Sequence, residues 1–262
     1  IMQLADSGQL KLNDPIAKYI PEYAKQFPAI EGKDITIRHL LSHTSGIPYI
    51  GTRQIYVAGS KFMYSNYNYR LLASIIEKVS GQSYATYVKE NIFFPLDMDD
   101  SMVSSNADGA SGIAVSARNL ANFANVFLRD GKYKDQSIIQ SSKIKKIFKA
   151  PDFIPKSSHM EYYGLGWRVN RENNLVKMFY HTGIWNGIFA DLRIMPQNQS
   201  FIIQLCNPPS YKSAGFTSYQ GQMHSLATRY IELLEKLPTQ PETELASVSF
   251  LEEQEDLFPD AD

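Results

Sequence analysis

Four short runs of branched and aromatic residues constrain the fold of this chain more than any other feature of its sequence. They occupy residues 163–169, 175–181, 188–195 and 200–206, and the segments between them contain Asn, Gly or Pro. Short apolar runs separated by turn residues are typical of strands joined by hairpins. The pattern therefore predicts an antiparallel meander in the second half of the chain.

Before residue 162 the apolar residues follow a helical period instead. The clearest helix is predicted by apolar residues that recur at helical spacing up to Gly81, namely Leu71, Leu72, Ile75, Ile76 and Val79. Shorter helices are predicted near 37–43, 120–128 and 144–148, and a last one follows the meander at 223–237. We therefore expect an α+β domain over residues 1–237, with a helical region at about 13–150 and an antiparallel sheet plus C-terminal helix at about 160–237.

The composition is that of an ordinary globular protein, with 44% hydrophobic residues, 20% charged residues and a formal net charge of -1. This balance excludes a dominant role in nucleic-acid or membrane-surface binding, and no apolar run is long enough to span a membrane. The charge is uneven, because the chain after Lys236 carries eight acidic residues and no basic one. Residues 238–262 are predicted to form a flexible acidic tail.

Two short motifs carry the chemistry that the sequence suggests. Tyr64-Ser65-Asn66 precedes the clearest helix, and His181-Thr182-Gly183 ends the second predicted strand and leads into the third. A Tyr-x-Asn loop together with a basic residue before Thr-Gly is found in penicillin-recognising serine hydrolases, alongside a Ser-x-x-Lys motif that supplies the nucleophile.

Seven blocks in this order resemble the serine hydrolases that include class C β-lactamases, D-alanyl-D-alanine carboxypeptidases and related esterases. They lie at 8–15, 35–46, 64–66, 79–84, 95–98, 163–167 and 181–183, within a resemblance that extends from residue 1 to about 237. The resemblance implies a β-lactamase/transpeptidase-like fold, with an antiparallel sheet flanked by helices and a mainly helical region. It also implies acyl transfer on ester or amide substrates through a serine acyl-enzyme.

The resemblance implies roles for individual residues. Tyr64 would move a proton between the serine and the leaving group, and Asn66 would orient the lysine and bind the substrate amide. His181 stands where many relatives have lysine, and its weaker positive charge favours an esterase or a small-peptide amidase. The segment Thr182, Gly183, Ile184 and Trp185 would bind the substrate, with the Ile184 amide in the oxyanion hole; for Trp185, a wall of the pocket and simple packing remain equally open.

The Ser-x-x-Lys motif has one match, Ser142-Lys143-Ile144-Lys145, which falls between the other two motifs on a basic helix. We read it as a solvated helix face. By resemblance, the nucleophile would lie about ten residues before Ile1, so the chain is expected to be N-terminally truncated. The N-terminal strands that relatives place beside 200–206 and the nucleophile helix would then be missing, and a completing N-terminal segment becomes a possible partner.

Two functions stay open on the sequence alone. The first is a serine hydrolase that is inactive without its Ser-x-x-Lys segment, and the alternative is a non-catalytic module that binds a ligand or a partner. No cofactor is predicted, because no Gly-rich phosphate loop follows a strand, and His39 and His43 lack a third ligand for a metal. The resemblance favours a periplasmic or secreted location.

Overall fold

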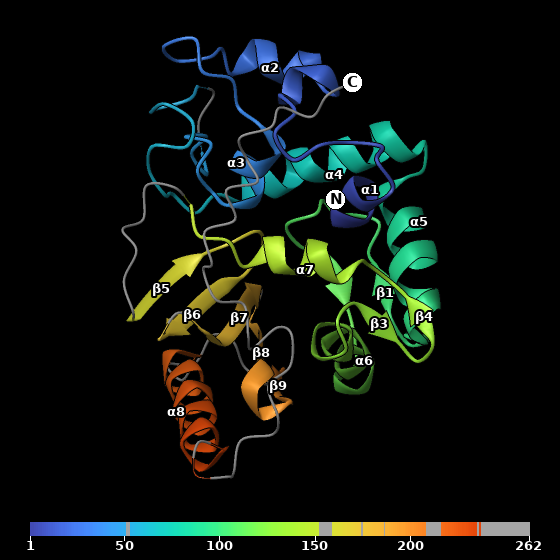
Figure 1. Cartoon of the computed structure of the whole chain (residues 1–262), viewed down its shortest axis with the longest axis vertical. Coiled ribbons are helices and arrows are strands. Elements are labelled where there is room, and N and C mark those ends of the chain that lie inside the picture. The colour runs from blue at the N-terminus through green and yellow to red at the C-terminus, as the bar shows by residue number, and fades with distance from the viewer. Residues whose placement is uncertain are drawn as a thin grey trace.

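The structure of the chain, a computed structural model, describes residues 1–50, 53–151, 159–173, 175–185, 187–207, 216–234 and 236. Most of the helices lie in the upper and right parts of Figure 1, a five-stranded sheet lies below them, and the helix Phe216–Leu234 lies at the bottom. The predicted α+β architecture is therefore confirmed. Residues 238–262, predicted to be a flexible tail, lie outside the described part of the chain.

The sheet is an antiparallel meander whose strands pair in chain order, as predicted. It consists of β5 (His159–Tyr163), β6 (Arg168–Glu172), β7 (Leu175–Trp185), β8 (Ile188–Met195) and β9 (Ser200–Cys206). The register is regular between β7 and β8, where His181 pairs with Leu192 and Thr182 with Asp191. Because paired residues share a face and successive residues alternate, His181 and Thr182 belong to opposite faces of the sheet.

The first predicted strand, 163–169, is wrong. Tyr163 ends β5, Arg168 begins β6, and the residues between them form a turn closed by a hydrogen bond from Gly164 N to Trp167 O of 2.8 Å. Gly166 has a φ of +95°, and a Cβ on Gly164 would lie 2.4 Å from the Ile147 carbonyl oxygen. The two glycines therefore form a tight turn that an apolar pattern conceals.

The second predicted strand ends too early, since β7 continues to Trp185 and the His-Thr-Gly motif lies inside it. The last helix, α8 (Phe216–Leu234), begins earlier than predicted. Its predicted apolar side is largely exposed, since Leu226, Tyr230 and Leu233 are 44%, 52% and 58% exposed, whereas Ala227 is buried.

The other α-helices precede the sheet. They are α1 (Met2–Asp6), α2 (Pro21–Gln26), α3 (Ile37–Leu41), α4 (Asn66–Ser80), α5 (Tyr84–Val88), α6 (Ala117–Leu128) and α7 (Ser141–Ile147). Short helical turns lie among them at Ile16–Lys18, Lys89–Phe93 and Phe94–Leu96, and another, Pro196–Asn198, lies between β8 and β9. Two hairpins pair β1 (Met102–Val103) with β2 (Ile113–Ala114) and β3 (Lys132–Tyr133) with β4 (Gln136–Ser137). Thr36 caps α3, and Gly81 ends α4 with a φ of +72°, both as their residue types predict.

The main core lies between the helices and the face of the sheet that carries Phe179. Phe179 is fully buried, and its ring centre lies 4.4 Å from that of Phe148, 5.1 Å from that of Trp167 and 5.5 Å from that of Phe127. These contacts fix β7 against α6 and the end of α7. Because His181 lies on the same face as Phe179, the core also fixes the height of His181 above the sheet.

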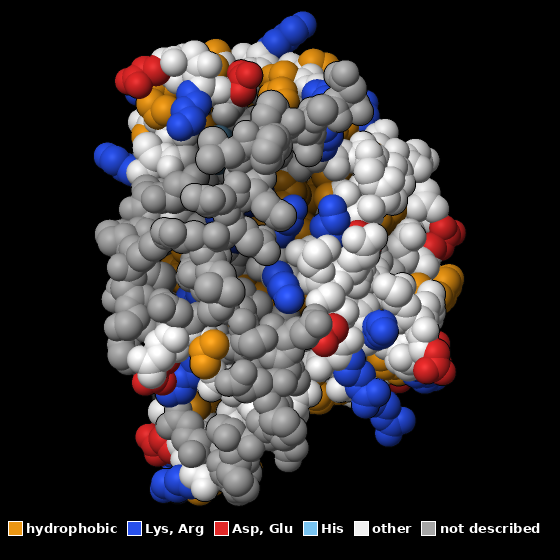
Figure 2. Space-filling view, viewed as in Figure 1, with side chains coloured by type: hydrophobic (Ala, Val, Ile, Leu, Met, Phe, Trp, Pro, Cys, Tyr) orange, Lys and Arg blue, Asp and Glu red, His pale blue; other side chains and the backbone are white. Residues whose placement is uncertain are grey.

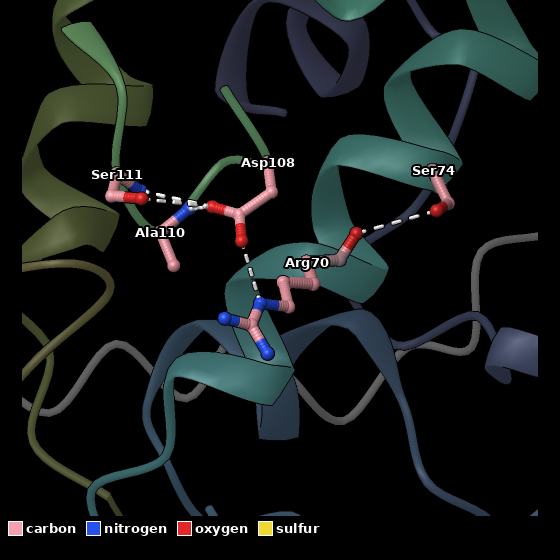
Figure 3. Close-up of polar contacts among 5 residues, drawn as sticks. All are labelled: Arg70, Ser74, Asp108, Ala110 and Ser111. Atoms are coloured by element: carbon pink, nitrogen blue, oxygen red, sulfur yellow. Dashed lines mark hydrogen bonds and ion pairs between the residues drawn. The ribbon is translucent and has the colours of Figure 1, made fainter. Parts of the chain in front are cut away.

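An ion pair fastens the loop between β1 and β2 to α4 (Figure 3). Arg70 Nε donates to Asp108 Oδ2 at 2.7 Å, and Asp108 Oδ1 accepts from the backbone N–H groups of Ala110 and Ser111 at 3.1 Å. The loop passes close to α4 because Gly109 lacks a side chain, and a Cβ there would lie 2.5 Å from the Tyr69 carbonyl oxygen. The first turns of α4, which follow Tyr64, are thereby held from one side.

Candidate functional site

Tyr64 and Asn66 flank the start of α4. Ser65 is the residue that precedes the helix, and Asn66, which is half-buried, is its first residue; Tyr64 is 40% exposed. The Tyr64 ring lies over His43, with ring centres 4.1 Å apart. The Tyr-x-Asn motif is therefore presented at the surface on top of a buried histidine.

His43 is the centre of an aromatic cluster that also contains Phe62, Tyr64, Tyr69 and Tyr163. It is fully buried and has a φ of +56°, just after the end of α3. Its Nδ1 accepts a hydrogen bond from Ser65 N at 3.1 Å and lies 3.3 Å from Asn68 Nδ2. His43 thus fixes the backbone directly after Tyr64 while its ring supports the tyrosine.

Asn68 extends this network. Its Oδ1 accepts from Ser45 Oγ at 2.7 Å, and Ser45 Oγ in turn accepts from Ile47 N at 3.0 Å. Both Ser45 and Asn68 are fully buried. Ser45 therefore has a structural role here, joining the 43–47 turn to α4.

His181 faces this cluster from the sheet. Its Nε2 lies 3.0 Å from the Tyr163 hydroxyl, and its ring centre lies 6.3 Å from that of Tyr64. Tyr64 and Tyr163, which lie far apart in sequence, thus meet at His181, and both also contact His43. The structure brings together the two motifs that the sequence singled out.

Among the residues that the structure describes, the part of β7 after His181 has a strand partner on one side only. Pairing between β6 and β7 ends at Arg168 and Tyr180, whereas β7 stays paired with β8 as far as Trp185. Backbone N–H and C=O groups of an antiparallel strand point alternately to its two sides, so part of residues 181–185 faces no named strand. Gly183, Ile184 and Trp185 are exposed there, whereas Thr182 lies on the face opposite to His181 and pairs with Asp191.

Burial sets the charge states of the site. Burial, the nearby His181 and Arg168 lower the pKa of His43 to about 3. Burial and Arg168 also lower the pKa of His181, while burial raises the pKa of Tyr64, an effect that Arg168 partly offsets. At neutral pH both histidines are therefore neutral, and the Tyr64 phenol keeps its proton.

The low pKa of His43 predicts acid sensitivity. The pKa of a histidine in an unfolded chain is about 6.5. Below this pH the histidine is protonated in the unfolded state, whereas His43 stays neutral in the folded state. We expect the His43 contribution to lower the free energy of unfolding by about 1.4 kcal/mol per pH unit as the pH falls from 6.5 toward 3. Urea unfolding at pH 7 and pH 5 measures this, and H43Q should show a smaller loss; equal losses in the two proteins would contradict it.

The single Ser-x-x-Lys match does not enter the site. Ser142 and Lys145 are exposed on α7, whose buried residues are Ile144 and Ile147. Lys143 Nζ donates to the Ala5 carbonyl oxygen at 3.3 Å. In Figure 2, which has the same view as Figure 1, Lys and Arg side chains lie near the middle of the molecule, where Figure 1 shows α7.

Within the described ranges, no group of three or more His, Cys, Asp or Glu side chains is placed to hold a metal ion. His39 and His43, the one pair at helical spacing, serve different partners, because His39 Nδ1 accepts from Thr36 N at 3.2 Å. Among the same residues, no helix has the length and apolar character needed to cross a membrane.

The sequence analysis missed His43, Tyr69, Tyr163 and Arg168 as site residues. His43 and Tyr163 lie in two of the seven blocks that carry the resemblance, but His43 was assigned to the end of a helix and Tyr163 to the start of a strand. The available signal for Tyr163 was its place directly before Gly-Leu-Gly, since the glycines end the strand at the tyrosine. Tyr69 carried no signal beyond its place in an amphipathic helix.

A helical region packed on an antiparallel meander, with a Tyr-x-Asn loop facing a His-Thr-Gly strand, defines the class of β-lactamase-like serine hydrolases. The chain belongs to the Beta-lactamase family, whose family model matches residues 1–218.

Individual relatives agree with this assignment. Penicillin-binding protein 4* of Bacillus subtilis is 26% identical over 265 residues, which cover 79% of this chain and 57% of the relative. The D-alanyl-D-alanine-carboxypeptidase/endopeptidase AmpH of Escherichia coli is 30% identical over 155 residues, covering 50% of this chain and 40% of AmpH. The crystal structure of a β-lactamase/D-alanine carboxypeptidase from Yersinia pestis has a TM-score of 0.69 at 20% identity, over 89% of this chain and 79% of the other. The chain spans about half the length of the curated relatives it matches.

Proposed function

We propose that this chain supplies two walls of a serine acyl-transfer site that acts on ester, amide or small-peptide substrates. The Tyr64 loop forms one wall, and the strand from His181 to Trp185 forms the other. The nucleophilic serine and its lysine would come from a Ser-x-x-Lys segment that is not among these 262 residues. The observation that carries the proposal is the approach of Tyr64 and His181, whose ring centres lie 6.3 Å apart.

The protonation state of Tyr64 explains why the lysine is needed. Burial raises the Tyr64 pKa, so its phenol is a poor base in this chain. An ammonium group placed beside it would stabilise the phenolate and allow Tyr64 to take the proton of the serine. Asn66, at the start of α4, would orient that lysine and bind the substrate amide.

The open edge of β7 supports substrate binding by backbone pairing. The Ile184 N–H would donate to the oxyanion, and one such donor contributes about 3–4 kcal/mol to lowering a barrier. Trp185 shares a face with His181 by strand alternation and is 57% exposed, which favours its role as a wall of the pocket over simple packing. Thr182 would contribute through its backbone, because its side chain belongs to the other face.

Gly183 offers a prediction that separates function from folding. Among the described residues, a Cβ at this position would meet only the Ala190 Cβ, at 4.0 Å, so this part of the fold does not require glycine. G183A is expected to change the free energy of unfolding by less than about 1 kcal/mol while weakening ligand binding along the edge. Urea unfolding and ligand titration measure the two effects, and a large loss of stability would contradict this reading.

Intact mass after exposure to a β-lactam or a fluorophosphonate tests the proposed function. The chain alone is expected to gain no adduct, whereas the chain co-expressed with a segment bearing Ser-x-x-Lys is expected to gain one on that segment. Y64F in the same complex should slow acylation by about 10²–10⁴-fold. Stoichiometric acylation of the chain alone would refute the proposal.

An alternative function is a non-catalytic module that binds a peptide or acyl ligand, or a partner. The observation in its favour is that Tyr64 and residues 183–185 are exposed, while the one Ser-x-x-Lys match lies outside this site on α7. Ligand binding without acylation, even with the Ser-x-x-Lys segment present, would support this alternative. The family membership favours a periplasmic or secreted location for either function.

A further inference from the structure

A pocket lies where α1 meets the end of α4 and α5, three helices that Figure 1 shows side by side. Its volume is about 460 Å³, a size typical of pockets that bind small molecules. The candidate functional site contributes none of the described residues that line it. A ligand bound in this pocket would therefore contact none of the residues proposed for acyl transfer.

Four side chains that line the pocket are amides, namely Gln3, Gln9, Gln82 and Asn91. A carbonyl oxygen can only accept, so a hydrogen bond to one identifies the nitrogen end of an amide. Gln3 Nε2 donates to the carbonyl oxygens of Asn91 and Ile138 at 3.0 and 3.3 Å. Asn91 Nδ2 donates to the Tyr87 carbonyl oxygen at 2.9 Å. The protein itself thus fixes the orientation of these two amides.

The other two amides are oriented by the same rule. Gln82 Nε2 donates to the Glu90 carboxylate. The turn that ends α1, at Gly8 with a φ of +74°, places Ser7 and Gln9 on the pocket. Ser7 Oγ uses its proton on the Leu4 carbonyl oxygen at 3.2 Å, so it must accept from Gln9 Nε2 at 3.0 Å.

These bonds leave a defined set of polar groups for a ligand. Among the described residues, none donates to the side-chain oxygens of Gln9, Gln82 and Asn91, and each of these amides also keeps one N–H unused. Gln9 is exposed, and Gln82 and Asn91 are half-buried. A hydroxyl group both donates and accepts, so a ligand with several hydroxyls matches such amides.

The charges around the pocket favour a neutral ligand. None of the described residues that line it is Lys, Arg or His, so an anion would lose hydration without gaining an ion pair. Asp6 lines the pocket, but its Oδ2 already accepts from Gln140 N at 3.1 Å. Lys143 Nζ donates to the carbonyl oxygen of the neighbouring Ala5 at 3.3 Å, and its positive charge disfavours a second cation nearby.

The apolar part of the pocket offers little surface to a ligand. Leu4 and Tyr87 line it, but they are only 2% and 7% exposed. An acyl chain or a peptide with apolar side chains would therefore bury little apolar area here. We propose that the pocket binds a neutral polyhydroxylated ligand of the size of a mono- or disaccharide, held by the amides of Gln9, Gln82 and Asn91.

An NMR titration of the ¹⁵N-labelled chain with methyl α-D-glucopyranoside tests the proposal. We expect saturable shifts in the backbone signals of residues 3–9 and 80–91, with a Kd of about 1 mM, as for a ligand of this size. Shifts confined to other residues, or no saturable shift, would overturn the proposal.

Three further probes test the chemical class of the ligand. D-glucosamine and D-glucuronate keep the sugar ring but carry an ammonium or a carboxylate, and N-acetylglycinamide presents peptide amides without hydroxyls. Each should bind at least about fivefold more weakly than the methyl glucoside, the factor that one net hydrogen bond provides. Equal or tighter binding of any of the three would refute a neutral polyol as the ligand.

A pair of serine variants tests the place of binding. Ser7 is exposed and lines the pocket, so S7L should fill part of it and weaken binding of the methyl glucoside more than about tenfold. S60L is the matched control, because the exposed Ser60 Oγ also donates to the carbonyl oxygen three residues earlier, that of Val57 at 2.7 Å, but Ser60 does not line the pocket. S60L should bind as the wild-type chain does.

Urea unfolding confirms that the variants are folded before they are compared. If S7L does not fold, Q9A removes only an exposed amide and should weaken binding about fivefold. Wild-type affinity in a folded S7L or in Q9A would overturn the proposal. The outcome is independent of the acylation test, which concerns other residues.

Discussion

Replacing Arg193 with alanine is expected to lower the free energy of unfolding by about 3–5 kcal/mol. Arg193 Nε lies 2.8 Å from Asp191 Oδ2, and the two side chains are only 5% and 0% exposed. The Tyr180 ring covers the guanidinium, with its centre 5.3 Å from Arg193 Cζ. The substitution would leave a fully buried carboxylate without its guanidinium partner, at a site that water cannot reach.

The matched control is a surface pair of the same type. Lys134 and Asp97 form an ion pair with side chains that are 69% and 49% exposed, so K134A should cost less than about 1 kcal/mol. Urea unfolding of both variants at pH 7 gives the comparison. Losses of similar size would show that the burial of the Asp191–Arg193 pair does not determine its contribution. The pair lies on the sheet face opposite to His181, so the loss should appear as stability rather than as a change in His181 titration.

A second large effect is expected for Gly131, which follows α6 and precedes β3. It has a φ of +87°, and a Cβ there would lie 1.9 Å from the Ile139 carbonyl oxygen. The neighbouring backbone cannot move away easily, since the Gly131 carbonyl accepts from Ile138 N and Ile139 N at 2.8 and 3.1 Å. G131A is therefore expected to cost more than about 4 kcal/mol or to prevent folding.

A comparison with Gly81 separates the steric clash at Gly131 from the strain of its left-handed backbone conformation. It has a similar φ of +72°, but a Cβ there would meet nothing within 4 Å. G81A should therefore cost only the strain of the left-handed conformation, about 1–2 kcal/mol. Thermal or urea unfolding of the two variants makes the comparison, and a G131A loss no larger than that of G81A would contradict the steric argument.

Local sequence patterns predicted the helices and strands well where a single kind of residue determines the structure. The helical spacing before Gly81 predicted most of α4, and the hairpin residues predicted the antiparallel meander. The pattern failed at residues 163–169, because apolar residues on both sides of Gly164 and Gly166 look like a strand until the positive φ of Gly166 is seen. It also failed on α8, whose apolar positions are exposed, since periodicity shows that a helix has an apolar side but not what covers it.

The candidate site was predicted only in part for a related reason. Tyr64, Asn66 and His181 were found because they belong to short motifs with a known chemistry. His43, Tyr69 and Tyr163 were missed because their roles depend on partners more than 20 residues away in sequence for His43 and Tyr69, and across a misread turn for Tyr163. The role of such a residue is assigned from the residues that lie close to it in space, and a local sequence pattern does not identify them.

The sequence alone determined the class of this protein: the order of its helical and stranded halves, the seven blocks that resemble the serine hydrolases, and the Tyr-x-Asn and His-Thr-Gly motifs. These are properties of spacing and residue type, which are readable along a single chain. Only the tertiary structure decided that Tyr64 rests on a buried neutral His43, that Thr182 lies on the sheet face opposite to His181, and that the Tyr163 hydroxyl lies 3.0 Å from His181 Nε2. The burial of a side chain, the sheet face that it occupies and the side chains that it contacts depend on distant segments, so they are defined only once the chain has folded.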